Sequence, residues 1–368
     1  MITPIQNKYI SNNYNNTVYA EHKQYCPAFK SNILLKSAQS SEKGSRNVEF
    51  LGRKIVNFIT GFIGRKKITQ IYNELSNIEK TSPEYMGKMS KAGRIFAKEK
   101  EVEINLESNR IKDIVNSNEP HIFIMNHDNQ THDPEMMTMF NTFLSDEYIK
   151  SGKASTCPRP VVILNEDILL SMNKKRREIF EKMGAIGIDA SLYSADGKKN
   201  AKKLIPVLRD FVMGKANIYI FPEGKMSAYK NLDIKDKFQT GVADMVHLLV
   251  NKRDDVRVVP LAFDYNKKSK PLLSSIYIGS PIIFKKEGTH VLSSSGNVSS
   301  SFTSDDYKNF FNNPDIDYET ITDKGIPVEG KNTVAYIGGV LCENLRICKE
   351  EAKAVLSKKS LGDKVLEC

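Results

Sequence analysis

The sequence predicts an α/β fold, in which a mixed, mostly parallel sheet is flanked by helices and follows an N-terminal helical region. From residue 101 onward, short apolar runs alternate with segments of helical period. The apolar runs are continuous, which is typical of strands buried on both faces, and helices between such strands imply the crossover connections of a parallel sheet. The 17 Phe and 15 Tyr supply enough bulky apolar surface for a packed core.

The chain is expected to divide into three regions. Residues 1–45 are rich in Asn, Ser, Lys and Tyr without sustained periodicity, so we expect a poorly ordered N-terminal tail. Residues 46–100 carry helical patterns and form the helical region. Residues 101–368 form the α/β domain.

Apolar residues in the helical region recur at helical spacing and predict two amphipathic helices, with a third at about 84–98. The first stripe comprises Ile55, Phe58, Ile59, Phe62 and Ile63, and the second comprises Ile68, Ile71, Tyr72, Leu75 and Ile78. Basic residues flank the first stripe on both sides. That helix is expected either to dock on an anionic membrane surface or to pack on the α/β core.

Within the α/β domain, the elements follow from the period of the apolar residues. Strands are expected at 102–106, 122–125, 161–164, 217–221, 256–263 and 275–279. Helices are expected at about 134–147, 174–183, 198–213, 239–251 and 335–357. The helix at 198–213 should end at Gly214 and can kink at Pro206. The serine-rich stretch 286–331 is expected to be a long surface excursion.

Composition restricts the partners and the compartment. The 54 basic and 44 acidic residues give a net charge of +10, which favours anionic partners such as nucleic acid, phospholipid headgroups or phosphorylated metabolites. The five cysteines are scattered and form no CxxC pair, so neither a disulfide framework nor a zinc site is indicated and a reducing compartment is expected. The sequence shows no secretory signal and no apolar run of membrane-spanning length, so we expect a cytoplasmic protein.

Polar residues follow the strand at 122–125 directly. The segment Asn126–Pro134 contains two histidines and two aspartates, at the strand end where open α/β sheets bind ligands. A histidine with a nearby carboxylate is the minimal general-base pair, because the carboxylate orients the ring toward a substrate hydroxyl. The alternative is a polar loop that caps the next helix, with Asp133 before Pro134.

The strand at 217–221 ends in a turn that carries a carboxylate, a cation and a hydroxyl, Phe221-Pro222-Glu223-Gly224-Lys225-Met226-Ser227. Together with the histidine segment, this turn resembles the PlsC-like glycerolipid acyltransferases, the family of glycerol-3-phosphate and 1-acylglycerol-3-phosphate acyltransferases. The first block of that family is NHxxxxD and its third is FPEGTRS.

Two further segments support the resemblance, which covers about residues 100–285. The segment Gly184–Asp189 is similar to the second block of the family, and Val258–Ala262 is similar to the fourth. Lys237 and Phe238, with Gly241, resemble the lysine and glycine segment before the fourth block. The resemblance identifies residues 101–368 as an acyltransferase domain.

The sequence departs from the family pattern at three places. Five residues separate His127 from Asp133 where the family has four, so either Asp133 or Asp128 orients the histidine. In the third block, Lys225 replaces a threonine and Met226 replaces an arginine. In the second block, an alanine follows Asp189 where an arginine is common.

The resemblance implies direct acyl transfer without an acyl-enzyme, a metal or a resident cofactor. His127 takes the proton of a glycerol-backbone hydroxyl, which attacks the thioester of acyl-CoA or acyl carrier protein. Asp133 and Glu223 complete the catalytic set, and backbone N–H groups near Gly224 are candidates to stabilise the oxyanion. The alternative role of Glu223 is to stabilise the turn.

The expected acceptors are glycerol-3-phosphate or a lysophospholipid such as 1-acylglycerol-3-phosphate, in phospholipid biosynthesis at the inner face of a membrane. Lysines bind phosphate as point charges and can replace the missing arginines. The expected substrate-binding residues are Gly224, Lys225, Ser227, Lys198, Lys199 and Lys237. For the lysines at 198 and 199, the alternative is a solvated helix face.

Two other functions remain open from the residues alone. Asn126-His127-Asp128 also resembles the NHD block of metallophosphoesterases, but that chemistry needs several His and Asp ligands, and the remaining histidines occur in no such context. A relative that binds anionic membranes without catalysis is the other possibility. The sequence contains no recognisable nucleic-acid-binding motif.

Overall fold

The structure is a computed structural model of the whole chain. It describes 67, 70–71, 73–74, 78, 83–100, 103–106, 108–127, 132–172, 174–182, 184–188, 197–223, 238, 241–266, 273–287, 290–294, 326–327 and 331–365. The predicted tail and the first amphipathic stripe lie outside these residues and stay predictions. The described residues all belong to one compact unit, Gly64–Cys368.

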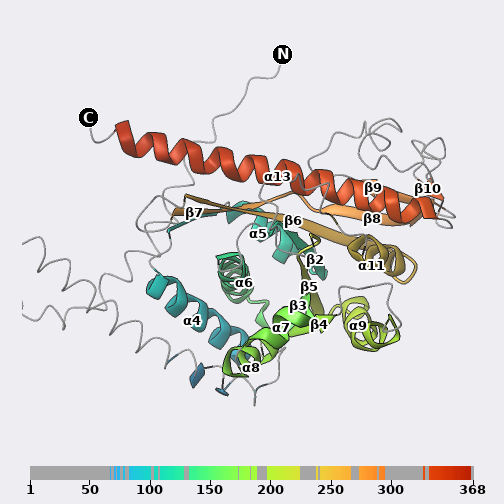
Figure 1. Cartoon of the computed structure of the whole chain (residues 1–368), viewed down its shortest axis with the longest axis horizontal. Helices are drawn as coiled ribbons and strands as arrows, with labels where there is room; N and C mark the ends of the chain where they lie inside the picture. The colour runs from blue at the N-terminus through green and yellow to red at the C-terminus, as the bar shows by residue number, and fades with distance from the viewer. Residues whose placement is uncertain are drawn as a thin grey trace, which may run out of the picture. The chain divides into compact units, whose positions relative to one another are not determined.

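A single ten-stranded mixed sheet organises this unit (Figure 1). Its main path runs β10-β9-β8-β6-β2-β5-β3-β4, and β7 pairs with both β6 and β1. The strands are β1 (Glu103–Leu106), β2 (His121–Met125), β3 (Arg159–Asn165), β4 (Ala185–Ile188), β5 (Ala216–Ile220), β6 (Asp255–Asn266), β7 (Leu273–Ile278), β8 (Ile282–Glu287), β9 (His290–Ser294) and β10 (Ile326–Pro327).

The neighbours β6, β2, β5, β3 and β4 are parallel to one another, as are β1 and β7. The remaining pairings, of β6 with β7 and β8 and of β9 with β8 and β10, are antiparallel. The predicted mixed, mostly parallel sheet is therefore confirmed. Its parallel half gathers the carboxyl ends of β2, β5 and β6 at one edge.

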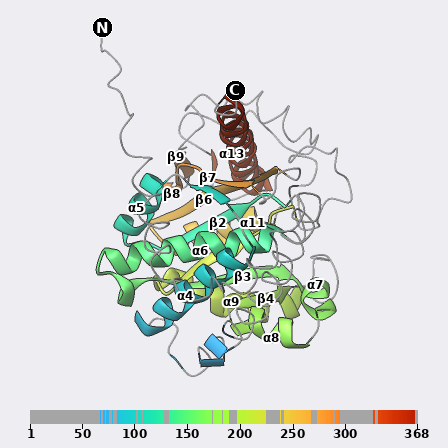
Figure 2. The same cartoon turned by 90° about the vertical axis from the view of Figure 1, so that its left-hand side faces the viewer.

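Helices cover both faces of the sheet (Figures 1 and 2). The helices are α4 (Pro83–Lys100), α5 (Ser108–Ser117), α6 (His132–Lys150), the short η1 (Ala154–Thr156), α7 (Glu166–Ser171), α8 (Lys174–Lys182), α9 (Gly197–Val212), α11 (Gly241–Val250) and α13 (Lys331–Val365). Helices α4, α5 and α6 share one apolar cluster with the sheet, and α9, α11 and α13 share the other.

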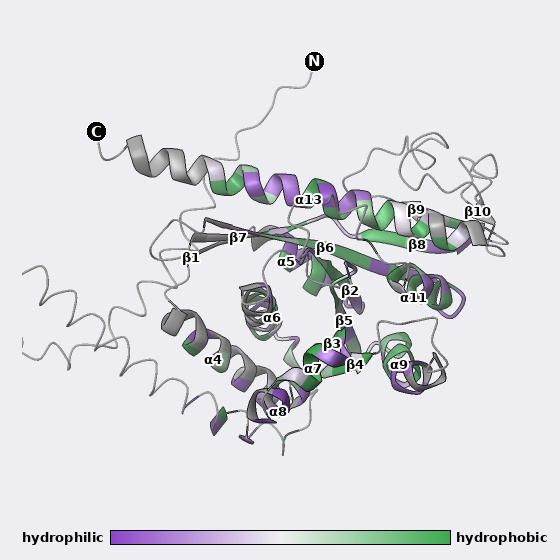
Figure 3. Cartoon of the chain, viewed as in Figure 1, coloured by the Kyte–Doolittle hydropathy of each residue, from purple (hydrophilic) through white to green (hydrophobic). Residues whose placement is uncertain are grey.

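Successive residues of the strands point to opposite clusters, as the period of two requires. In β2, Ile122 and Ile124 belong to the α9 and α13 side, whereas Phe123 and Met125 belong to the α6 side. All five residues of β2 and of β5 are buried, which explains why both strands are apolar apart from His121 and Asn217. Figure 3 shows apolar colour over β6, β8 and α11.

Most expected elements are present, and the differences have a local cause. Each predicted strand and each helix expected from 84 onward has a counterpart. The sequence pattern did not predict α5, α7, β4, β8, β9 and β10, most of which are too short to show a period. The expected surface excursion at 286–331 is wrong in part, because β9 and β10 lie within it and pair with the sheet.

Helix α4, the third predicted helix, packs on α6. Its Tyr85 and Ala92 are buried, and Asp146 of α6 accepts hydrogen bonds from Ser90 and Arg94 of α4. The α4 helix therefore belongs to the same compact unit as the sheet.

Helix α9 runs through Pro206 and ends as predicted at Gly214, which has a φ of +73°. The N–H of Gly214 bonds to the carbonyl of Phe211, and the N–H of Lys215 bonds to that of Asp210. This pair of bonds is a Schellman motif, which uses the conformational freedom of glycine to end the helix.

Strand β6 changes partner along one of its edges. Its first residues pair with β8, and from Leu261 onward it pairs with β7. Pro260 lies at the change, where Gly279 donates its N–H to the Pro260 carbonyl at 2.8 Å. A Cβ at position 279 would lie 2.4 Å from Pro260 Cγ and 2.5 Å from Cys348 Sγ, so only glycine fits between the sheet and α13.

The described cysteines, Cys157, Cys342 and Cys348, are buried thiols that form no disulfide with one another. Burial raises the pKa of the Cys157 thiol above its usual range. None of the helices in the described part of the chain has both the length and the apolar character needed to cross a membrane.

Candidate active site

The candidate site lies where β2 and β5 end, beside the part of β6 that continues past them. His127 follows β2 by two residues, and Glu223 follows β5 by three. The two strands are paired in parallel, with Ile124 beside Ile220, so their carboxyl ends bring His127 and Glu223 to the same edge. The third contributor, β6, extends beyond this edge.

His127 is paired with Asp133. Its Nδ1 lies 2.7 Å from Asp133 Oδ2, and the aspartate is fully buried while the histidine is 8% exposed. The two side chains make this contact although five residues separate them in the sequence, one more than in the family pattern. Asp128, the alternative partner, lies outside the described residues.

Helix α6 positions the aspartate. It begins at His132, so Asp133 occupies its first turn, with Pro134 next. A carboxylate in the first turn is stabilised by the positive end of the helix dipole, and proline is tolerated there because its missing N–H has no helical partner. The side chain of Asp133 reaches His127, so Asp133 does more than cap a helix.

A second residue holds the same carboxylate. The hydroxyl of Tyr265 in β6 donates to Asp133 Oδ1 at 2.5 Å. The two carboxylate oxygens therefore bind different partners, His127 and Tyr265, and the three side chains form a buried chain of hydrogen bonds.

Asn126 joins the ends of β2 and β6. Its side-chain amide donates to the Phe263 carbonyl at 3.0 Å, and its side-chain oxygen accepts from the Phe263 N–H at 2.7 Å. The amide thus continues the parallel ladder for one step beyond the strand. Asn126 is fully buried, so water does not readily replace these two bonds. They fix the backbone directly before His127.

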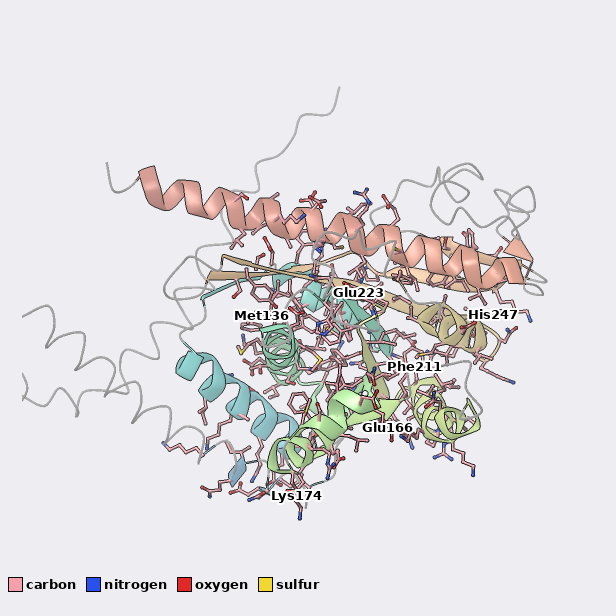
Figure 4. The ribbon with its side chains drawn as sticks, in the orientation of Figure 1. Met136, Glu166, Lys174, Phe211, Glu223 and His247 are labelled. Atoms are coloured by element: carbon pink, nitrogen blue, oxygen red, sulfur yellow. The ribbon has the colours of Figure 1, made fainter. Side chains whose placement is uncertain are left out.

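Glu223 holds the backbone of the histidine. Its Oε1 accepts the N–H of His127 at 2.8 Å, and the glutamate is 2% exposed. The Phe221 ring lies against the imidazole, with centroids 4.8 Å apart. Figure 4 labels Glu223 in the interior of the fold, whereas Lys174 and His247 lie at its periphery.

This geometry suits a general base. A buried carboxylate beside Nδ1 favours the tautomer protonated at that nitrogen, which leaves Nε2 to accept a proton. Among the described residues, Nε2 has no hydrogen-bond partner. The Phe221 ring packs against the imidazole and leaves Nε2 available.

The structure brings together the three expected catalytic residues, His127, Asp133 and Glu223. Lys198 and Lys199 lie in the first turn of α9, but their side chains are outside the description. The other expected binding residues, Gly224, Lys225, Ser227 and Lys237, also lie outside it. Lys203, later in α9, binds Glu166 and the carbonyl of Gly187 and so stabilises the fold.

Sequence reasoning missed Tyr265 and the backbone clamp made by Asn126. The signal for Asn126 was present, since it directly precedes His127 in the first block. No local sequence pattern indicated Tyr265, because it contacts Asp133 only in the folded protein, where the position of β6 in the sheet brings the two together. Over the described ranges, no three His, Cys, Asp or Glu side chains gather in a way that could hold a metal ion.

Comparison with known protein families agrees with this site. Residues 105–264 match the family model described as Acyltransferase, a span that includes His127, Asp133 and Glu223. The chain therefore carries an acyltransferase domain. That domain belongs to the PlsC-type acyltransferase family. A comparison with curated proteins found no match to the chain.

Proposed function

We propose that the protein moves a fatty acyl group from acyl-CoA or acyl carrier protein to a hydroxyl of glycerol-3-phosphate or of a lysophospholipid such as 1-acylglycerol-3-phosphate. The buried pair of His127 and Asp133 carries the proposal, because it is a preorganised general base at the carboxyl end of a parallel strand. The family match favours this function over the metallophosphoesterase alternative.

The reaction uses the pair as follows. Nε2 of His127 takes the acceptor hydroxyl proton as the oxygen attacks the thioester carbonyl carbon. The tetrahedral intermediate collapses and the C–S bond breaks. The leaving thiolate then takes the proton from the imidazolium. Asp133 stabilises the imidazolium between these steps. No resident cofactor takes part, since the acyl donor is itself a substrate.

Glu223 supports this chemistry by holding the His127 backbone. Near it, the N–H groups around Gly224 are proposed to stabilise the oxyanion. We propose that basic and polar residues bind the acceptor phosphate in place of the arginines of the family. The candidates are Lys198, Lys199, Lys225, Ser227 and Lys237.

We also propose an anionic membrane as a partner, because the acceptor and product of phospholipid synthesis reside there. The exposed face of α9 supports this assignment. Residues 174–203 contain nine Lys or Arg against four Asp or Glu. The positions described as exposed on and just after α9 include no acid, namely Lys202, Ile205, Pro206, Arg209, Met213 and Lys215.

Two of these exposed residues are large and apolar, Ile205 at 62% and Met213 at 55%. Apolar side chains among cations are the composition of helices that lie in an anionic membrane interface. The acidic residue nearest this face, Asp210, is paired with Arg159 at 2.5 Å. These features support the proposal that the enzyme acts at the cytoplasmic face of a membrane.

One assay tests the function. Purified protein is incubated with labelled acyl-CoA or acyl carrier protein donors and with glycerol-3-phosphate or lysophosphatidic acid. We expect ester formation with one donor and acceptor pair, and we expect His127→Ala to lower turnover by roughly 100-fold or more, the usual contribution of positioned proton transfer. His132→Ala, the control, should cost far less. If neither substitution matters, the proposed base is wrong.

A further inference from the structure

We propose that Tyr265 is a positioning residue that sets both the orientation and the proton affinity of His127 through Asp133. This inference rests on the proposed function, since it assigns the residue a part in the same general base. The bond from the Tyr265 hydroxyl to Asp133 Oδ1 carries it.

The bond completes the fixation of a buried carboxylate. With Oδ2 bound to His127 and Oδ1 bound to Tyr265, rotation of the Asp133 carboxylate breaks one hydrogen bond or both. Asp133 is fully buried and Tyr265 is 9% exposed, so water has little access to replace either bond. A charge-assisted bond in such surroundings is stronger than one between neutral groups.

The fold delivers Tyr265 through an extension of β6. The register of β2 with β6 ends at Met125 and Leu261, and β6 continues to Asn266. Over this extension β6 pairs with β7, and Tyr265 stands opposite Ser274. Residues Leu261, Phe263 and Tyr265 alternate toward the α6 side, which is the side that holds Asp133.

The same strand therefore makes two contacts with the site. Phe263 binds the side chain of Asn126, and Tyr265, two residues later on the same face, binds Asp133. The part of β6 that pairs with β7 thus carries Tyr265, which holds the Asp133 partner of His127. Glu223 holds the backbone N–H of the same histidine.

A phenol that donates to one carboxylate oxygen withdraws negative charge from the other. Without it, Asp133 would stabilise the imidazolium of His127 more strongly. Asp133 and Glu223 are the titratable groups bonded to His127 among the described residues, and Tyr265 acts behind Asp133. Of these two carboxylates, Asp133 bonds to the ring and Glu223 bonds to the backbone N–H.

The test is Tyr265→Phe, with Tyr148→Phe as the matched control. Tyr148 in α6 is also buried in the apolar cluster on this side of the sheet, but its hydroxyl has no hydrogen-bond partner among the residues that the structure describes. We expect Tyr265→Phe to lower kcat by roughly tenfold, as for loss of a hydrogen bond to a charged group, with little change in the acceptor KM. The acid limb of kcat/KM should move to higher pH. Tyr148→Phe should leave both unchanged.

A second readout needs no activity. The titration of the His127 ring, followed by NMR of imidazole-labelled protein, should move to higher pH in Tyr265→Phe and stay in place in Tyr148→Phe. If the parent protein transfers no acyl group, the proposed function is wrong, but the His127 titration still tests the inference. An unchanged titration in Tyr265→Phe overturns the inference even if acyl transfer is found.

The combination Tyr265→Phe with Asp133→Asn separates positioning from a general loss of packing. If Tyr265 acts through Asp133, its substitution should shift the His127 titration in the parent and have no further effect in Asp133→Asn. An equal shift in both backgrounds would show that Tyr265 acts by another route.

Discussion

The imidazole of His127 is positioned by three residues from three segments of the chain. Asp133 from α6 holds the ring, Glu223 after β5 holds the backbone N–H, and Asn126 joins the preceding residue to β6. Each bond is buried, where a hydrogen bond is hard to replace by water. We therefore expect substitutions here to change catalysis more than surface substitutions do.

The partner of the histidine can be tested by comparing two carboxylates. Asp133→Asn should lower kcat by roughly 100-fold, because an amide no longer stabilises the imidazolium or selects the reactive tautomer. Asp128→Asn should cost far less, since Asp133 already occupies Nδ1. Steady-state kinetics at saturating donor measure both. A larger loss in Asp128→Asn would reverse the assignment.

The acceptor phosphate provides a test of Lys225. A phosphate contact made equally in the ground state and the transition state affects binding alone, so Lys225→Ala should raise the acceptor KM more than it lowers kcat. Lys252→Ala, an exposed lysine just after α11, serves as the control. An unchanged acceptor KM in Lys225→Ala would count against a role in phosphate binding.

At the scale of single elements, helix ends in this protein depend on glycine. Gly214 after α9 and Gly152 after α6 both have positive φ, at +73° and +70°. A Cβ at either position would meet no atom within 4 Å, so the backbone alone selects glycine there. Gly87 inside α4 has equal space but an ordinary helical conformation.

These glycines predict opposite effects of the same substitution. Gly214→Ala should lower the free energy of unfolding by about 1 kcal/mol, because alanine is strained at positive φ. Gly87→Ala should raise it by about 0.5 to 1 kcal/mol, because alanine loses less backbone entropy in a helix. Urea unfolding followed by circular dichroism measures both. Equal signs for the two changes would contradict the argument.

The exposed face of α9 predicts how the protein binds vesicles. Replacing both Ile205 and Met213 with Glu should reduce flotation with vesicles rich in phosphatidylglycerol by roughly tenfold or more, because the change removes apolar contact and adds repulsion. The control is Ile149→Glu on α6, which is 40% exposed and lies on the other side of the sheet.

The same flotation assay tests the N-terminal stripe. Deletion of residues 46–67 should weaken binding if the stripe Ile55–Ile63 also docks on the membrane. Binding that survives both the deletion and the α9 double substitution would exclude these two surfaces. Binding of the parent to neutral vesicles alone would contradict the role of the basic residues.

At the scale of the whole molecule, a buried histidine links stability to pH. His121 opens β2, far from the candidate site, and is 1% exposed. Burial, assisted by the positive charge of Arg257, lowers its pKa from 6.5 to about 3. The folded protein therefore keeps His121 neutral at a pH where the unfolded chain takes up a proton.

This depressed pKa predicts acid sensitivity with a definite sign. Below about pH 6.5 the unfolded state binds one proton more than the folded state, so stability falls as the pH falls, by up to about 1.4 kcal/mol per pH unit. Between pH 7 and pH 5 the loss from this group should be about 2 kcal/mol. In His121→Leu the difference between the two pH values should shrink by that amount. The same difference in both proteins would show that other groups cause it.

Much of this molecule was predictable from local pattern. The apolar runs within β2, β3, β5 and β6 marked these strands, since a strand buried on both faces is mostly apolar. The short elements β4 and α7, of four and six residues, were missed because a period cannot be read over so few positions. The strand β9, which pairs with β8 and β10, was missed because its short sequence ends in serines and lies in a serine-rich stretch that resembles a loop.

The sequence by itself determined the α/β class, the position of His127 after a buried strand and the family to which its motifs belong. Only the tertiary structure decided that Asp133 contacts the ring across an extra residue, that Glu223 holds the His127 backbone and that Tyr265 binds Asp133. The physical reason is the distance along the sequence over which each effect acts. Apolar period and turn residues act over a few neighbours, whereas these contacts join positions up to 132 residues apart, and strand register brings them together.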